Sequence, residues 1–115
     1  IVDYKATSTA SEISLEDEFR QPYKRQMEVY QWIFRKMGFK VSPVGYFVFA
    51  NALKDRNFFD NKLEFELTIL SHQGEDSWVS PTLMDMKAIL ESDTIPEANP
   101  DCEYCEYRRL TKEVE

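Results

Sequence analysis

The residues of this chain that are best placed to do chemistry are an acid and a lysine near its beginning. Ile1-Val2 is a short apolar run, and Asp3-Tyr4-Lys5 follows it directly. Successive side chains of a strand point to opposite faces, so Asp3 and Lys5 share one face, roughly 6–7 Å apart along the backbone. A carboxylate and an ammonium in this arrangement can hold a divalent metal and orient its water. The alternative is a strand that ends in solvated charge.

A glutamine and a tyrosine follow on a second element. Gln26 and Tyr30 lie four residues apart, one turn of helix, and therefore share a helix face. On a helix over residues 23–37, Gln26 falls inside the apolar stripe. A buried amide without hydrogen-bond partners loses about 1–3 kcal/mol. We therefore expect a polar partner beneath this helix, either a backbone group or the site of Asp3 and Lys5.

The acid-x-Lys spacing is not specific by itself, because Asp60-Asn61-Lys62 and Asp85-Met86-Lys87 share it. The second triplet falls in a polar turn, and the third lies on an expected helix, where residues i and i+2 diverge. Only the first triplet follows an apolar strand and leads into a small polar loop. Its interpretation as a site depends on the helix that carries Gln26.

The pattern of the whole chain predicts an α/β (α+β) fold in the order β-α-β-β-α-α. Strands are expected at residues 1–5, 44–50 and 63–70, and helices at residues 23–37, 80–91 and 102–112. The second strand is apolar on both faces, which is typical of an interior strand in a sheet covered on both sides. Gly38 ends the first helix, and Ser80-Pro81 begins the second. We expect one domain over residues 1–115.

Periodicity also predicts which side chains are buried. The stripe of the first helix contains Tyr23, Met27, Tyr30, Ile33, Phe34 and Met37, and Gln31 falls with the charged residues outside it. In the third strand, Leu63, Phe65, Leu67 and Ile69 are expected to point inward, and in the second helix Leu83, Met86, Ile89 and Leu90. His72, within Ser-His-Gln-Gly, is expected in a solvated turn.

Composition limits the class of protein. The chain has 115 residues, of which 43% are hydrophobic and 14% aromatic, so it is globular rather than disordered. No apolar run approaches the ~20 residues of a membrane span, and no secretory leader is visible. Two cysteines and many charged residues indicate a cytoplasmic protein.

The net charge of −7 argues against a general nucleic-acid coat, but the charge is uneven. Residues 16–40 contain six basic residues and four acids, whereas residues 85–115 contain nine acids and four basic residues. A neutral-to-basic region therefore lies beside the suspected site. Three scattered glycines make no phosphate-binding loop, and the single histidine has no motif for nucleophilic catalysis around it.

The arrangement of these motifs resembles the PD-(D/E)xK nuclease superfamily, and within it the RecB-like exonuclease branch that includes the CRISPR-associated exonucleases. The resemblance rests on the strand ending in Asp3-Tyr4-Lys5, the helix bearing Gln26 and Tyr30, the two strands after it, and the tail Cys102-Glu103-Tyr104-Cys105-Glu106-Tyr107. It spans nearly all of the chain but only the C-terminal portion of the family domain. The family's first metal-binding Asp would lie upstream of Ile1, which suggests a fragment or a processed product.

The resemblance implies a restriction-endonuclease-like mixed sheet flanked by helices and a Mg²⁺- or Mn²⁺-dependent deoxyribonuclease. Asp3 and the backbone carbonyl of Tyr4 would be metal ligands. Lys5 would position the attacking water and stabilise charge on the phosphate, while Gln26 and Tyr30 would orient the site or contact the scissile strand. The implied substrate is DNA, as single strands or duplex ends, cleaved in an exonuclease-like manner in repair, recombination or defence, with a helicase or repair protein as a candidate partner.

One carboxylate and one carbonyl are few ligands for a small hard cation, so we expect residues 1–115 alone to be inactive and the intact domain to be active. Two other functions remain open. One is a non-catalytic interaction domain that keeps the nuclease fold. The other is an unrelated small binding module in which Asp3 and Lys5 form an exposed ion pair worth under about 1 kcal/mol.

The tail contains the two cysteines, Cys102 and Cys105. A zinc site or an iron–sulfur cluster takes four ligands. Relatives that carry a cluster have a third C-terminal cysteine at the place that Thr111 occupies in this chain. We therefore expect two small buried thiols that anchor the terminal helix, rather than an iron–sulfur cluster.

Overall fold

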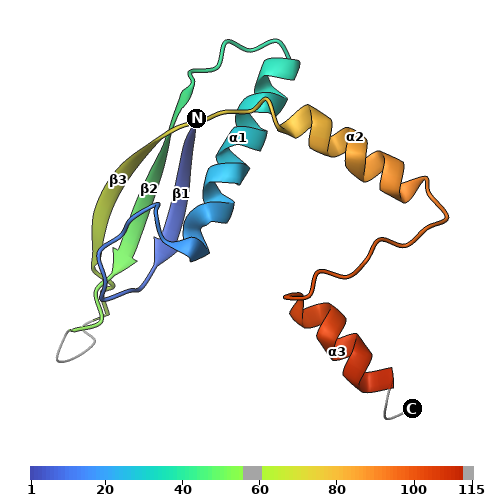
Figure 1. Cartoon of the computed structure of the whole chain (residues 1–115). Helices are drawn as coiled ribbons and strands as arrows, with labels where there is room; N and C mark the ends of the chain where they lie inside the picture. Colours follow the sequence, from blue (N-terminus) through green and yellow to red (C-terminus); the bar gives the residue numbers. More distant parts are fainter. Residues whose placement is uncertain (56–60, 113–115) are drawn as a thin grey trace. The chain divides into compact units, whose positions relative to one another are not determined.

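The structure is a computed structural model that describes residues 1–55 and 61–112 (Figure 1). It contains two compact units, Ile1–Ser80 and Pro81–Glu115. The first unit holds β1 (Val2–Thr7), the short 3-10 helix η1 (Glu18–Arg20), α1 (Gln21–Lys36), β2 (Val44–Ala52) and β3 (Phe65–Gln73). The helix α2 (Val79–Leu90) begins at the end of that unit, and α3 (Glu103–Lys112) lies in the second. The expected order β-α-β-β-α-α is confirmed.

The first unit is built on a mixed three-stranded sheet in the order β1-β2-β3. β1 runs parallel to β2, and β2 runs antiparallel to β3. A parallel pair cannot be joined by a hairpin, so the chain crosses over through α1, which lies along one face of the sheet (Figure 1). The prediction that β2 is an interior strand is confirmed, but Tyr46, on the face opposite Phe47, is exposed, so the expected cover of both faces is not seen among the described residues. Of the Asp60 triplet, Asp60 itself lies outside the described residues.

The core lies between α1 and the sheet. Alternate residues of β2 point toward the helix, so Phe47 and Phe49 are buried there together with Met27 of α1. The register places Asp3 beside Phe47 and Lys5 beside Phe49. The face of β1 that carries the acid and the lysine is therefore the face that α1 covers.

Two glycines let the backbone come close to this helix. A Cβ atom on Gly45 of β2 would lie 2.7 Å from Cγ of Met27, and one on Gly74 would lie 2.9 Å from Cδ of Gln31. Both separations are too short for carbon atoms, so neither position accepts a side chain without movement of the neighbour.

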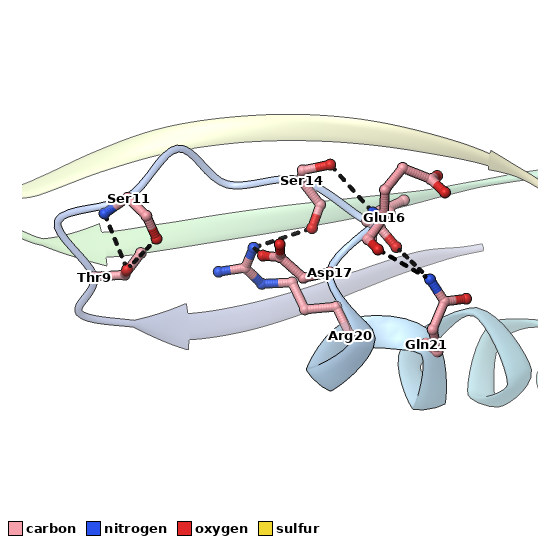
Figure 2. A network of polar contacts seen from close by, with 8 residues as sticks. Thr9, Ser11, Ser14, Glu16, Asp17, Arg20 and Gln21 are labelled. Atoms are coloured by element: carbon pink, nitrogen blue, oxygen red, sulfur yellow. Dashed lines mark hydrogen bonds and ion pairs between the residues drawn. The ribbon is translucent and has the colours of Figure 1, made fainter.

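The loop that follows β1 is held by its own polar contacts (Figure 2). Arg20 donates to the carbonyl of Ser14 at 3.0 Å and forms an ion pair with Asp17. Nε2 of Gln21 donates to the carbonyl of Leu15 at 3.2 Å. These bonds join the start of α1 to the loop segment that carries Ile13 and Leu15, two residues of the core.

The predicted facing of the third strand is wrong. Phe65, Leu67 and Ile69 are exposed, as is Leu63 before the strand. The pairing of Leu70 with Phe47 places the even-numbered residues of β3 on the side of α1. Because the side-chain period of a strand is two, this register turns the whole odd-numbered set to the other face. The side chains of the strand alternate as predicted, but the more hydrophobic set faces away from α1.

The predicted stripe of α1 is correct at Tyr23 and Met27 and wrong farther along. Ile33, Phe34 and Met37 are exposed, whereas Gln31 is fully buried. Nε2 of Gln31 donates to the carbonyls of Ser42 at 3.1 Å and Pro43 at 2.9 Å. At this level of the helix, the buried side therefore carries a polar side chain that is bonded to the segment before β2. Gly38, with φ of 90°, follows the end of the helix as expected.

In the second unit, Leu83, Met86, Ile89 and Leu90 are exposed, so their predicted burial is not seen. No helix among residues 1–55 and 61–112 has the length and apolar character that a membrane span requires.

Replacing Gln31 with Leu should lower the free energy of unfolding by about 1–3 kcal/mol, because the buried amide would lose its two hydrogen bonds to the carbonyls of Ser42 and Pro43; the Pro43 carbonyl still accepts the amide of Gly74. Urea denaturation of the purified protein measures this. The matched control is Gln73→Leu, which makes the same exchange at an exposed position of β3 and should change the stability by less than about 0.5 kcal/mol. Equal effects of the two substitutions would contradict this account of Gln31.

Candidate functional site

The site is built around the ammonium group of Lys5. Nζ lies 3.0 Å from Oδ2 of Asp3 and donates a hydrogen bond of 2.7 Å to Oε1 of Gln26. The side chains of Lys5 and Asp3 are only 18% and 17% exposed. The structure thus brings together the three groups that the sequence predicts to converge. Two come from alternate positions of β1 and the third from the helix above it.

Gln26 extends the site toward Tyr30. Nε2 of Gln26 donates to the hydroxyl oxygen of Tyr30 at 2.7 Å. An ammonium can only donate, so the amide must turn its oxygen to Lys5 and its nitrogen to Tyr30. The hydroxyl of Tyr30 accepts this bond and keeps its own proton for another acceptor. Because Tyr30 is 37% exposed, the chain of contacts from Asp3 ends at the protein surface.

Asp3 has a buried carboxylate oxygen whose lone pairs are only partly used. Among the described residues, the partner of Oδ2 is the ammonium of Lys5 at 3.0 Å, and no further hydrogen bond reaches this oxygen. A carboxylate oxygen has two lone pairs, so Oδ2 has remaining capacity for a cation.

The backbone carbonyl of Tyr4 is also placed to take a ligand. In a parallel pair, alternate residues of a strand direct their N–H and C=O groups to the same neighbour. The amide of Tyr46 donates to the carbonyl of Ile1 at 3.0 Å, so Ile1, Asp3 and Lys5 bond to β2. The carbonyl of Tyr4 therefore points to the other edge of β1, away from β2.

These two oxygens fit part of a site for a hard divalent cation, which prefers oxygen ligands. The described residues contain no group of three or more His, Cys, Asp or Glu side chains that could hold a metal ion. The type of ligand at Asp3 and Tyr4 thus agrees with magnesium or manganese, while the number of ligands falls short.

A family model places this geometry in context. The model of the PD-(D/E)XK nuclease superfamily matches residues 1–110. The chain belongs to this superfamily. No curated protein and no solved structure matched the chain.

The mixed sheet flanked by helices agrees with the superfamily fold, and the interpretation as an unrelated small binding module is wrong. Members of the superfamily are nucleases that generally use divalent metals and act on DNA, which makes nuclease the class of activity that this domain carries.

A second polar cluster of this nuclease-family domain was not predicted from the sequence. His72 lies in β3, and its Nε2 is hydrogen-bonded to Oε1 of Glu28 at 2.9 Å. Nε1 of Trp78 donates to the other oxygen of Glu28 at 2.6 Å. The prediction of a solvated turn for His72 is therefore wrong. β3 extends to Gln73, beyond the predicted end of the strand at residue 70. His72 lies two residues after Leu70, so a strand of this length places both side chains on the side of α1.

The cysteines are more accessible than predicted. Cys105 is exposed and Cys102 is half-buried, so the expectation of two buried anchoring thiols is wrong. Cys102 directly precedes α3, and its carbonyl accepts the amide of Glu106 at 3.0 Å. The backbone N–H and the thiol of Cys105 hold the pKa of the Cys102 thiol below its usual range. Donating to Cys102 raises the pKa of the Cys105 thiol.

This difference predicts that iodoacetamide alkylates Cys102 before Cys105 near neutral pH. The thiolate is the reactive form, and the group with the lower pKa has the larger thiolate fraction at any pH below both values. Peptide mass spectrometry over a pH series measures the two rates. In Cys105→Ala the alkylation of Cys102 should slow near neutral pH, because the side chain at position 105 no longer donates to its sulfur. Faster alkylation of Cys105 in the unmodified protein would contradict the assignment.

Proposed function

We propose that this domain is a metal-dependent deoxyribonuclease that hydrolyses phosphodiester bonds in DNA, in an exonuclease-like manner and within the RecB-like branch of its superfamily. The observation that carries the proposal is the contact of Lys5 with both Asp3 and Gln26, made in a chain whose family consists of nucleases. DNA repair, recombination or defence, together with a helicase or repair partner and a cytoplasmic location, belongs to the same proposal.

Asp3 and the carbonyl of Tyr4 would hold Mg²⁺ or Mn²⁺. A bound cation of this kind supplies Lewis acidity and lowers the pKa of its water below that of bulk water. Oδ2 of Asp3 supports this role, because it is buried and, among the described residues, has no partner beyond the ammonium of Lys5. The edge position of the Tyr4 carbonyl supports it as well.

Lys5 acts as the cation that meets the phosphate. A charge aimed in advance at the place where negative charge develops stabilises a transition state without reorganisation during the reaction. Its ammonium is held at 2.7 Å by Gln26 and at 3.0 Å by Asp3, so its position is set before substrate arrives. A lysine in free solvent would have to be ordered at that moment, at an entropic cost.

Gln26 and Tyr30 connect this centre with the surface. Gln26 fixes Lys5 with its oxygen and fixes the hydroxyl of Tyr30 with its nitrogen. The remaining proton of Tyr30 can be donated to a phosphate oxygen of the scissile strand. Gln26 is thus the link through which binding of DNA at Tyr30 orients Lys5.

Substitution of the two charged residues tests the proposal in the complete gene product. Lys5→Met and Asp3→Asn should each lower kcat for a fluorescent DNA substrate by about 10²-fold or more, because each removes a charge that acts in the transition state. The matched control is Lys87→Met, which alters an exposed acid-x-Lys triplet on α2 and should leave kcat unchanged.

Cleavage by the wild-type protein that persists in both variants would contradict the assignment of the site. A gene product that binds DNA without cleaving it in Mg²⁺ or Mn²⁺ would favour the non-catalytic interaction domain instead.

The shortage of ligands gives a separate prediction for residues 1–115 on their own. This piece should cleave DNA poorly in Mg²⁺ or Mn²⁺, because a hard cation takes about six oxygen ligands and two are available from Asp3 and Tyr4. The complete gene product should lose activity in EDTA and regain it when either metal is added back. Strong metal-dependent cleavage by residues 1–115, lost in Lys5→Met, would show that Asp3 and Tyr4 suffice.

A further inference from the structure

Lys5 has a third neighbour that the nuclease motifs do not include. Its Nζ lies 4.5 Å from the centroid of the Tyr23 ring. Tyr23 stands three residues before Gln26 on α1, so about one turn of the same helix presents an aromatic face and an amide oxygen to the ammonium. An ammonium within about 6 Å of a ring face is attracted by the negative face of the ring.

The ring of Tyr23 is held in place by the core. Its centroid lies 6.4 Å from that of Phe47 and 6.3 Å from that of Phe49, and the ring planes are tilted by 38° and 49°. Phe49 is also the residue of β2 that pairs with Lys5. The aromatic group Tyr23, Phe47 and Phe49 therefore supports the ammonium from beneath the helix.

The three partners of Lys5 differ in charge. Asp3 is an anion that compensates the positive charge of the ammonium, whereas the amide of Gln26 and the ring of Tyr23 are neutral dipolar or quadrupolar groups. Neutral partners hold a cation in place and leave its net charge available to a phosphate. The ring of Tyr23 can thus help to hold the Lys5 ammonium in one position without compensating its positive charge.

We propose that Tyr23 is a positioning residue for the proposed nuclease reaction, and that the face of its ring, rather than its hydroxyl, holds the Lys5 ammonium in place. This inference rests on the proposed function of Lys5. It assigns no contact between Tyr23 and the substrate.

Kinetics of three variants of the complete gene product test the role of the ring. Tyr23→Leu should lower kcat by about tenfold and leave KM for DNA unchanged, since the DNA-facing groups remain. Tyr23→Phe keeps the ring and should retain kcat within about twofold. Phe34→Leu is the matched control, because it removes an aromatic residue of α1 that contacts Phe39 and is partly exposed. Its kcat should equal that of the wild type.

A spectroscopic measurement tests the contact even if Tyr23→Leu fails to fold. In the complete wild-type gene product labelled with ¹³C at the lysine ε position, the ε-methylene protons of Lys5 should be shifted upfield by the ring current of Tyr23. Loss of this signal in Lys5→Arg assigns it. Tyr23→Phe should keep the shift. A wild-type Lys5 signal at the ordinary position of surface lysines would overturn the inference.

The two experiments separate the failure of this inference from the failure of the proposed function. Absence of cleavage by the wild-type protein would end the proposed function, and with it a role for Tyr23 in the reaction. Wild-type cleavage with equal kcat in Tyr23→Leu would overturn the positioning role alone. A parallel loss of kcat in Tyr23→Leu and Tyr23→Phe would assign the effect to the hydroxyl and would overturn the role of the ring.

Discussion

A half-buried ammonium must be surrounded by groups that compensate the loss of water, and this requirement organises the first unit of the protein. α1 covers Lys5 and removes most of its water, so the helix has to supply polar groups that replace the lost hydration of the ammonium. It does so with the oxygen of Gln26 and the ring of Tyr23, while the strand contributes the carboxylate of Asp3. The set of partners around the ammonium is therefore complete only when α1 packs on β1.

The helix can meet this requirement only if it is fixed in rotation and in position along its axis. Polar contacts from the middle of the helix to its end do this. Gln31 holds the carbonyls before β2, Glu28 holds His72 and Trp78, and Arg35 forms an ion pair with Asp76. Each of these residues lies within about two or three turns of Gln26. A rotation of α1 would break them together, so the contacts that surround the site also determine its geometry.

The sequence was sufficient for the local part of this arrangement. Strand alternation placed Asp3 and Lys5 on one face, and the helical angle placed Gln26 toward the sheet, so the convergence of the three could be expected from short-range periodicity. The burial of Gln31 and the outward turn of Ile33 and Phe34 could not. They depend on carbonyls of Ser42 and Pro43, whose position is set by the path of the chain into β2. The same holds for β3, where pairing with β2 decided which half of an alternating strand faces the helix. Hydrophobicity ranks side chains by their tendency to be buried, but it gives no information on where a distant backbone acceptor lies in the fold.

The missing side chain at Gly45 also affects the site. Met27 occupies the space above this residue, and Met27 is the immediate neighbour of Gln26 along the helix. The clearance between α1 and β2 is therefore fixed at the same turn that reaches over to Lys5. A larger residue at position 45 would push that turn of α1 away from the sheet, and the amide of Gln26 would move with it. The absence of a side chain at Gly45 thus helps to set the position of the Gln26 amide relative to Lys5. A change of volume in the core would therefore also change the geometry of the site.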